Sequence, residues 1–260
     1  MKLLAIFFIV LLLTMNLPLI YSEGGYLYDS LRLRHADNPD ICLFEVNPSL
    51  YSNWDELKNL TLIGIAEWIV KLEYAYPNGD WDVKVKVIPW EDHALKLAED
   101  YNECDIMFNY EKTSNDMALG YTSLNFNKSW HKFMFINIFL ESQKSVTKII
   151  IGGDNKTTIS ADSVSYPLPP NTIKNIVVHE LGHGFGLGHF YSGMDRQNGY
   201  TKSVMVESID PFDKHQNLSV TYIDLKMLAK IYGENGWGSP QPVYQINGCN
   251  ILSTFVFRCF

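Results

Sequence analysis

Three histidines and one glutamate fall within residues 179–189, which read HELGHGFGLGH. On an α-helix, residues four apart lie on one face, so His179 and His183 can direct two ring nitrogens at one metal ion. Glu180 lies beside the first of them and can reach a water on that ion without being a ligand. This spacing predicts hydrolysis of peptide bonds that depends on a bound zinc ion.

The third histidine needs a turn in the chain. His189 would point away from the metal if the helix continued past His183, so we expect the helix to end near Gly186, which can adopt a positive φ. His189 then returns as the third ligand. Three imidazoles leave a fourth position for water, which is the pattern of catalytic zinc. We therefore predict His179, His183 and His189 as zinc ligands and Glu180 as the general base.

The motif HExxHxxGxxH followed by a methionine turn is the signature of the metzincin metallopeptidases. Here Met205, in the stretch SVMV at 203–206, supplies the methionine. The chain resembles a metzincin, and segments 175–178, 224–225 and 231–233 are similar to those of the matrixin-like branch. The resemblance implies an α+β (mixed α/β) fold, in which a twisted mixed five-stranded sheet lies with an active-site helix, a zinc cleft and a C-terminal helix.

The resemblance also implies roles for residues beyond the histidines. Met205 forms an apolar floor beneath the three ligands, and the wall of the main specificity pocket comes from about residues 206–214. Asp224 has two interpretations. It resembles an aspartate that supports the methionine turn in matrixins, and it also suits a first-turn helix acid.

Local patterns predict the elements that position these residues. Asn53 is expected to cap a helix, with Glu56 three residues later completing a capping box. Apolar residues then recur on one face of this helix, which ends at the sequence Pro-Asn-Gly at 77–79. Val83, Val85 and Val87 alternate with charged residues, which predicts a half-buried strand that packs on that helix. The apolar face of the helix comprises Leu62, Ile65, Ile69, Leu72 and Tyr76.

The remaining expected elements are short. We predict strands at 41–46, 105–108 and 132–140, an extended piece at 118–124 and a short helix at 91–100. The active-site helix is expected to start at 169–172, and the last helix runs from Ser219 or Thr221 to Gly233. By analogy with metzincins, the stretch from Leu119 to Ser123 is a candidate edge strand that holds a protein or peptide substrate, with an ordinary loop as the alternative.

The cysteines agree with an exported protein, since an even count in that setting usually means disulfides. Three pairings are possible. Cys249 and Cys259 could close a small loop, which leaves Cys42 and Cys104 to join neighbouring strands. Cys42 is also the only thiol near the leader, so a zinc-capping role is an alternative for it. Sequons at Asn59, Asn127, Asn155 and Asn217 permit glycosylation.

The N-terminal residues 1–22 are typical of a signal peptide, which places the protein outside the cell as a secreted protein. An uncleaved membrane anchor is the alternative, because the apolar run reaches almost the length that spans a bilayer. A short leader at 23–40, a catalytic domain at 41–233 and a cysteine-containing tail at 234–260 would follow. The formal charge of −8 argues against binding to nucleic acid.

Two further features bear on metals. The sequence Gly152-Gly153-Asp154 is compatible with a Ca²⁺ loop, but the density of carboxylates there is too low to support one. The other histidines, namely His35, His93, His131 and His215, have no partner at ligand spacing and are expected at the surface or as caps. We expect a monomeric zinc metalloendopeptidase. The alternative is a catalytically inactive, zinc-containing extracellular binding or surface protein.

Overall fold

The computed structural model describes residues 20–21, 27–30, 34–49, 51–95, 103–113, 118–126, 132–151, 157–191, 203–206, 209–211, 213, 216–238, 244–246, 249–252 and 256–259. For 20–21, 27–30, 93–95, 145–151, 157–162, 191 and all strands beyond 243, only the backbone is described. Almost all of the expected signal segment 1–22 lies outside these residues. Within them, no helix has both the length and the apolar character needed to cross a membrane.

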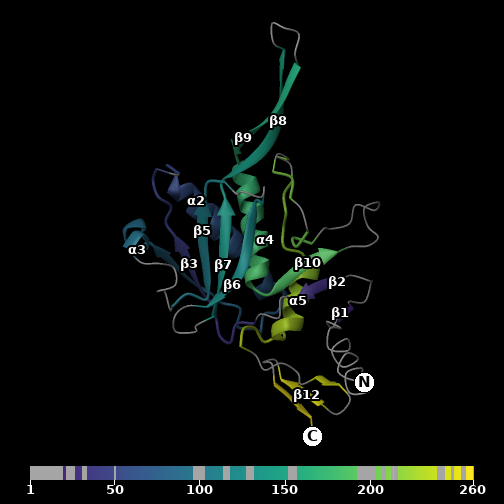
Figure 1. Cartoon of the computed structure of the whole chain (residues 1–260). Helices are drawn as coiled ribbons and strands as arrows, with labels where there is room; N and C mark the ends of the chain where they lie inside the picture. Colours follow the sequence, from purple (N-terminus) through teal and green to yellow (C-terminus); the bar gives the residue numbers. More distant parts are fainter. Residues whose placement is uncertain are drawn as a thin grey trace, which may run out of the picture.

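A five-stranded sheet forms the centre of the molecule (Figure 1). Its strands lie in the order β4, β3, β5, β7, β6, and all neighbours are parallel except β6, which runs antiparallel to β7 at one edge. The predicted mixed α/β fold with a five-stranded sheet is confirmed. The strands are β3 (Asp40–Phe44), β4 (Lys84–Ile88), β5 (Ile106–Glu111), β6 (Gly120–Phe126) and β7 (Lys132–Phe139).

Helices α2 (Trp54–Ala75) and α4 (Pro170–Gly184) pack together behind this sheet (Figure 1). The predicted cap of α2 is confirmed, because the Asn53 Oδ1 atom accepts the Glu56 N–H at 3.4 Å and its Nδ2 donates to the Glu56 carboxylate at 2.9 Å. The two helices come close where α2 carries Gly64, since a Cβ there would lie 2.6 Å from a methyl group of Val177.

The buried face of α2 is offset from the predicted one. Ile65 and Leu72 are buried as expected, whereas Leu62 and Ile69 are only partly buried. The fully buried Trp68 was not predicted, and its indole N–H donates to the Val178 carbonyl oxygen at 2.9 Å. Trp68 therefore joins α2 to the middle of α4.

Strand β4 departs from its predicted burial. Val85 and Val87 pair with Ile41 and Leu43 of β3, so they face the side of the sheet that α2 covers. Nevertheless, they are 37% and 43% exposed. The reason is that β4 is the edge strand on this side, and edge strands have a neighbour on one side only.

The other face of the sheet carries a smaller core. Phe44, Met107 and Phe133 are buried there around a disulfide between Cys42 and Cys104. Of the pairings left open by the sequence, this bond joins β3 to the segment before β5, and it makes the zinc-capping alternative for Cys42 wrong. Cys249 and Cys259 lie opposite each other at the Cα level in strands β12 and β13, but their side chains lie outside the described residues.

A long hairpin that the sequence did not reveal connects the sheet to α4. Strands β8 (Glu141–Ile151) and β9 (Thr157–Pro167) pair along their whole length and project away from the body of the protein (Figure 1). The stretch between β7 and α4, for which the sequence predicted no strand, is therefore mostly strand. The residues considered for Ca²⁺, at 152–154, lie outside the described residues.

The two ends of the chain form small antiparallel sheets. Near the N-terminus, β2 lies between β1 and β10, and near the C-terminus β12 lies between β11 and β13. The beginning of the tail is part of the main core, because Trp237 is 5% exposed and its backbone N–H donates to the Asp80 carbonyl oxygen at 2.9 Å. The remaining elements are β1 (Ile20–Tyr21), β2 (Leu27–Ser30), α3 (Trp90–Leu95), β10 (Leu187–Tyr191), α5 (Tyr222–Tyr232), β11 (Tyr244–Ile246), β12 (Cys249–Leu252) and β13 (Val256–Cys259).

Candidate active site

Helix α4 carries the first part of the site. It begins at Pro170, within the predicted start, where the missing N–H of proline costs no helical hydrogen bond. Val177, Val178 and Leu181 are fully buried, and the histidines on the same helix are nearly so. Most of the helix surface is buried, because α2 and the sheet pack against it, so its polar side chains are held in a restricted space.

The three predicted ligands come together. The Nε2 atoms of His179 and His183 are 3.1 Å apart, and those of His183 and His189 are 3.3 Å apart. Their ligand atoms all lie within 4.8 Å of one another. Two nitrogens that share a tetrahedral zinc ion at about 2.1 Å lie roughly 3.4 Å apart, so this spacing fits one ion.

The turn that brings His189 back occurs where expected. Gly186 has a φ of 99°, and its N–H donates to the His183 carbonyl at 2.9 Å. Strand β10 then carries His189 alongside the helix end. A non-glycine residue with this φ would be strained, which explains the need for glycine at this position.

Hydrogen bonds orient two of the imidazole rings. The Nδ1 atom of His179 lies 2.9 Å from the Val204 carbonyl oxygen, and that of His183 lies 2.8 Å from the Leu187 carbonyl oxygen. A carbonyl oxygen only accepts, so each Nδ1 carries the proton and each Nε2 presents a lone pair. Two lone pairs that face each other at 3.1 Å repel unless a cation lies between them. The donor chemistry therefore fits a metal such as zinc.

Both rings are neutral at neutral pH. Burial, together with the nearby His183, lowers the pKa of His179 to about 3. Burial likewise lowers the pKa of His183 to about 4, with His189 adding to the effect. Neutral imidazole is the form that binds a metal, so the site does not have to lose protons before it can do so.

Glu180 points toward the edge strand. Its Oε2 atom accepts a hydrogen bond of 2.7 Å from the hydroxyl of Thr122 on β6. Burial raises the pKa of Glu180 to about 7, although the bond from Thr122 acts in the opposite direction. A carboxyl group with a pKa near neutrality can both take up and release a proton. Gly120 makes room for it, because a Cβ there would lie 2.9 Å from the Glu180 Oε1 atom.

The methionine turn lies directly beneath the helix. Met205 is fully buried and packs against Gly182, between the two helical histidines. Its carbonyl oxygen accepts the Phe190 N–H at 2.7 Å, which ties the turn to the strand that carries His189. This position agrees with the apolar floor that the resemblance implied.

Asp224 has both of the roles that the sequence left open, at the methionine turn and at the start of α5. Its carboxylate accepts bonds from the N–H and hydroxyl of Thr221 at 2.8 and 2.7 Å, which is a capping box at the start of α5. It also accepts the Val204 N–H at 3.2 Å and the hydroxyl of Ser203. The Ser203 Oγ atom in turn accepts the Met205 N–H at 3.0 Å. Sequence reasoning missed Ser203, because only its place in the turn makes it functional.

The other histidines are not at the metal site where they can be placed. His35 is 8% exposed, so the surface interpretation is wrong for it, but its Nε2 atom caps the end of α4 at the Gly184 carbonyl, 2.9 Å away. His131, His215 and the side chain of His93 lie outside the described residues. Within the part of the chain that is described, the three histidines of the motif are the only metal-binding group found.

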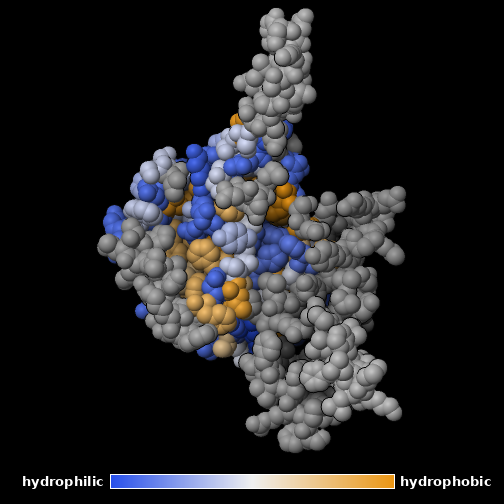
Figure 2. Space-filling view, in the orientation of Figure 1, coloured by the Kyte–Doolittle hydropathy of each residue, from blue (hydrophilic) through white to orange (hydrophobic). Residues whose placement is uncertain are grey.

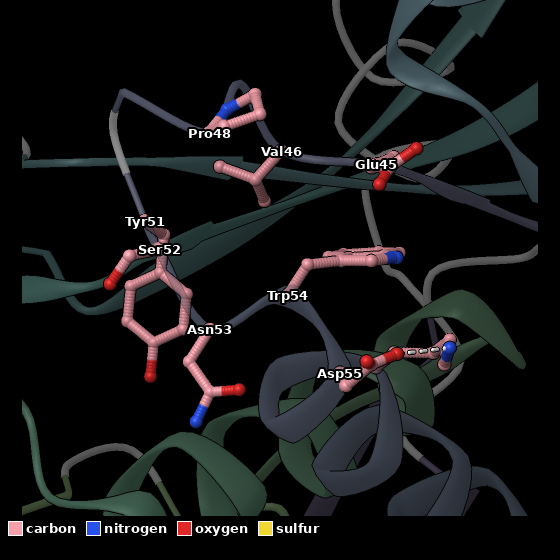
Figure 3. Close-up of a pocket in the computed structure, with 9 residues that line it drawn as sticks. Glu45, Val46, Pro48, Tyr51, Ser52, Asn53, Trp54 and Asp55 are labelled. Carbon is pink, nitrogen blue, oxygen red and sulfur yellow. Dashed lines mark hydrogen bonds and ion pairs between the residues drawn. The ribbon is translucent and has the colours of Figure 1, made fainter.

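A hollow in the described surface lies elsewhere. It has a volume of about 480 Å³ and is found where β3 ends and α2 begins. The ring of Trp54 lies across it, near Glu45 and Val46 (Figure 3). It shares no residue with the histidine site. Of the expected specificity wall at 206–214, Glu207, Phe212 and Lys214 lie outside the described residues.

A family model of peptidase M66 matches residues 166–229 of the chain. The matched span contains α4, the three histidines, Met205 and Asp224. The match supports a metallopeptidase. Such a protein uses a metal and acts on protein or peptide substrates. The match does not show whether the chain belongs to the matrixin-like branch or to another branch of the metallopeptidases. No curated protein sequence matches the chain.

Proposed function

We propose that the protein is a secreted, zinc-dependent metalloendopeptidase of the metzincin type. The observation that carries the proposal is that the Nε2 atoms of His179, His183 and His189 converge. The buried Glu180 lies next to His179 on the same helix. Neutral imidazoles with their Nδ1 atoms held by carbonyl oxygens suit zinc. The bonds that the Asp224 carboxylate accepts from Ser203 and Val204 in the methionine turn support the matrixin-like branch as the finer assignment.

Zinc in this position would polarise the scissile carbonyl and make a water more acidic. Glu180 is the base for this water. Because Thr122 holds the Oε2 atom, we assign Oε1 as the atom that takes the proton. The water oxygen bonds to the carbonyl carbon, the C–N bond breaks, and Glu180 returns the proton to the leaving amine. The products are a carboxylic acid, which then gives up its remaining proton, and an amine, and no side chain is acylated.

The substrate is proposed to lie along β6. Among the described strands, β6 has only β7 beside it, so its other edge is the candidate for main-chain hydrogen bonds with an extended peptide. Alternate residues of a strand share a face, so Leu124 and Phe126 lie on the side of Thr122, which contacts Glu180. Figure 2 shows a separate hydrophobic area on the face of the sheet opposite to the helices. Leu124 and Phe126, on the helix side, are 43% and 53% exposed. Apolar side chains of the peptide fit this surface.

The experiment is a digest of casein and a peptide library by the purified full chain, combined with metal analysis. We expect about one zinc per chain, cleavage that a chelator abolishes and zinc restores, and loss of most turnover in Glu180→Gln with zinc retained. A zinc-loaded Glu180→Gln protein with full turnover would refute the role of Glu180. A protein that holds zinc but cleaves nothing would favour the inactive binding protein.

Secretion is a separate part of the proposal. The disulfide between Cys42 and Cys104 supports an oxidising compartment. Expression in a secreting host should release the protein to the medium with a new N-terminus near residue 23, which N-terminal sequencing would detect. Retention in the membrane fraction with residues 1–22 intact would favour the anchor.

A further inference from the structure

The turn between the second and third histidines is held from outside the motif. Helix α4 ends at Gly184, one residue after His183, and the last carbonyl groups of a helix lack partners within it. The Gly184 oxygen lies 2.9 Å from the Nε2 atom of His35, and the Phe185 oxygen accepts the hydroxyl of Tyr232 at 3.1 Å. Both carbonyl groups are therefore satisfied by side chains that are distant in sequence.

The two side chains also contact each other. The backbone N–H of His35 donates to the Tyr232 hydroxyl oxygen at 3.1 Å, so the hydroxyl accepts from His35 and donates to Phe185. Since the Gly184 carbonyl only accepts, the His35 Nε2 atom carries a proton. The ring of His35 lies edge-on to Trp237 at 6.3 Å, and Trp237 packs on Phe185 at 4.9 Å. We call His35 and Tyr232 the turn clasp.

The segment before His35 lies alongside β10, the strand that carries His189. Strand β2 pairs antiparallel with β10, with Ser30 opposite Leu187 and Tyr28 opposite Phe190. The Leu187 carbonyl accepts the bond that orients His183. The N-terminal segment thus touches both ends of the turn, at the helix end through His35 and at β10 through β2 (Figure 1).

We propose that His35 is a positioning residue for the metal site, acting through the turn clasp to place His189 relative to His179 and His183. The inference rests on the proposed zinc-binding function. His35 does not touch the ligands. Its effect is to determine where α4 stops, and a small shift of Gly184 or Phe185 would move β10 and with it the third ligand. The part of the chain that supports the metal site then begins before His35, within the segment 23–40 that was predicted to be a leader.

The test compares zinc affinity and the visible absorption spectrum of the cobalt-substituted full-length protein. His35→Phe keeps a ring but removes the bond to Gly184, and we expect it to weaken zinc binding by about 10- to 100-fold and to change the cobalt spectrum. His35→Gln, which can still donate to the carbonyl, should recover most of the affinity. Tyr232→Phe, which loses only the hydroxyl, should weaken binding in the same direction.

Thr61→Val is the matched control. Its buried hydroxyl bonds to the Leu57 carbonyl and the Tyr110 hydroxyl, and not to the turn. It should lower the unfolding temperature yet leave zinc affinity and the cobalt spectrum unchanged. A folded His35→Phe protein with wild-type affinity and spectrum would overturn the inference, and so would an equal loss of zinc in Thr61→Val. Failure of the unmodified protein to bind zinc would instead overturn the proposed function, and the inference with it.

Discussion

The sulfur atom of Met205 occupies the space that a Cβ atom on Gly182 would fill. Gly182 lies between His179 and His183 on α4, so the methionine turn reaches the underside of the ligand helix only because this residue has no side chain. Trp68 confines the same space, with a ring carbon 3.1 Å from that position. Gly182 is therefore a packing requirement between two segments that are separate in sequence.

Gly182→Ala should lower the free energy of unfolding by about 1–3 kcal/mol, because the added methyl group overpacks the core. The higher helix propensity of alanine offsets at most about 1 kcal/mol of this. Displacement of Met205 should also weaken zinc binding. Urea unfolding and zinc titration measure both. Gly184→Ala is the control for stability alone, since its nearest neighbour would be the end of the Ile136 side chain at 3.2 Å. Equal stability of the two variants would contradict the packing argument.

Asp224→Asn should destabilise the protein by roughly 2–3 kcal/mol. The carboxylate accepts hydrogen bonds from Ser203, Val204 and Thr221. The NH₂ group of asparagine cannot accept, so at least one of these bonds would be lost. The methionine turn should loosen and zinc affinity should fall. Ser203→Ala removes one of these bonds, and a loss of about 1 kcal/mol is expected. If Asp224→Asn had wild-type stability, the carboxylate would not be what holds the turn.

Thr122→Val should reduce turnover by about 10-fold while leaving zinc affinity unchanged, because the valine cannot hold the Glu180 carboxylate in position. Thr122→Ser keeps the hydroxyl and serves as the matched control. Steady-state kinetics on a peptide substrate, with metal content measured for each variant, would test this. A loss of the same size in the serine variant would show that the methyl group and not the hydroxyl matters.

Glu67 predicts how stability depends on pH. Burial alone would raise its pKa, but hydrogen bonds from Ser219, Lys174 and the Val220 N–H outweigh burial and lower the pKa to about 2. The folded pKa lies below the unfolded value of about 4.3, so the stability from this group is present above that value and is lost as the pH falls toward 2.

The measurement is urea unfolding of the unmodified protein and of Glu67→Gln between neutral pH and the lowest pH at which the protein still folds. The variant should be less stable at neutral pH by about 1–3 kcal/mol, and the gap should narrow as the pH falls below about 4. Glu73→Gln, an exposed position on the same helix, should show no such gap. A gap that stays constant down to the acid limit would show that Glu67 is not the group involved.

Local patterns predicted the features that depend on neighbouring residues. The spacing of His179 and His183, the cap at Asn53 and the turn at Gly186 each follow from backbone geometry over a few residues, and the structure has them where expected. The edge strand at β6 was also anticipated, with bounds shifted toward the C-terminus. Features that depend on which elements lie across the core were harder to predict from the sequence, as the burial of Trp68 and the exposure of Val85 illustrate.

The long hairpin of β8 and β9 shows a different limit. Its strands pair with each other and project from the body, so no core imposes a strong apolar alternation on the sequence by which it could be recognised. The partner that His35 caps and the role of Ser203 were not predicted, for a related reason. A lone histidine and a lone serine carry no periodic signal, and each acquires its role only from one carbonyl or carboxylate that folding brings next to it.

The sequence by itself determined the chemistry of this protein, because three histidines and a glutamate at these intervals suit one metal ion and one base whatever surrounds them. Only the tertiary structure decided how the site is held. Asp224, Met205, Thr122 and His35 act across gaps of many residues, and their hydrogen bonds and contacts exist only once α2, the sheet and the chain ends pack around α4. Spacing along a helix is a local property, whereas support for the ligands depends on long-range packing.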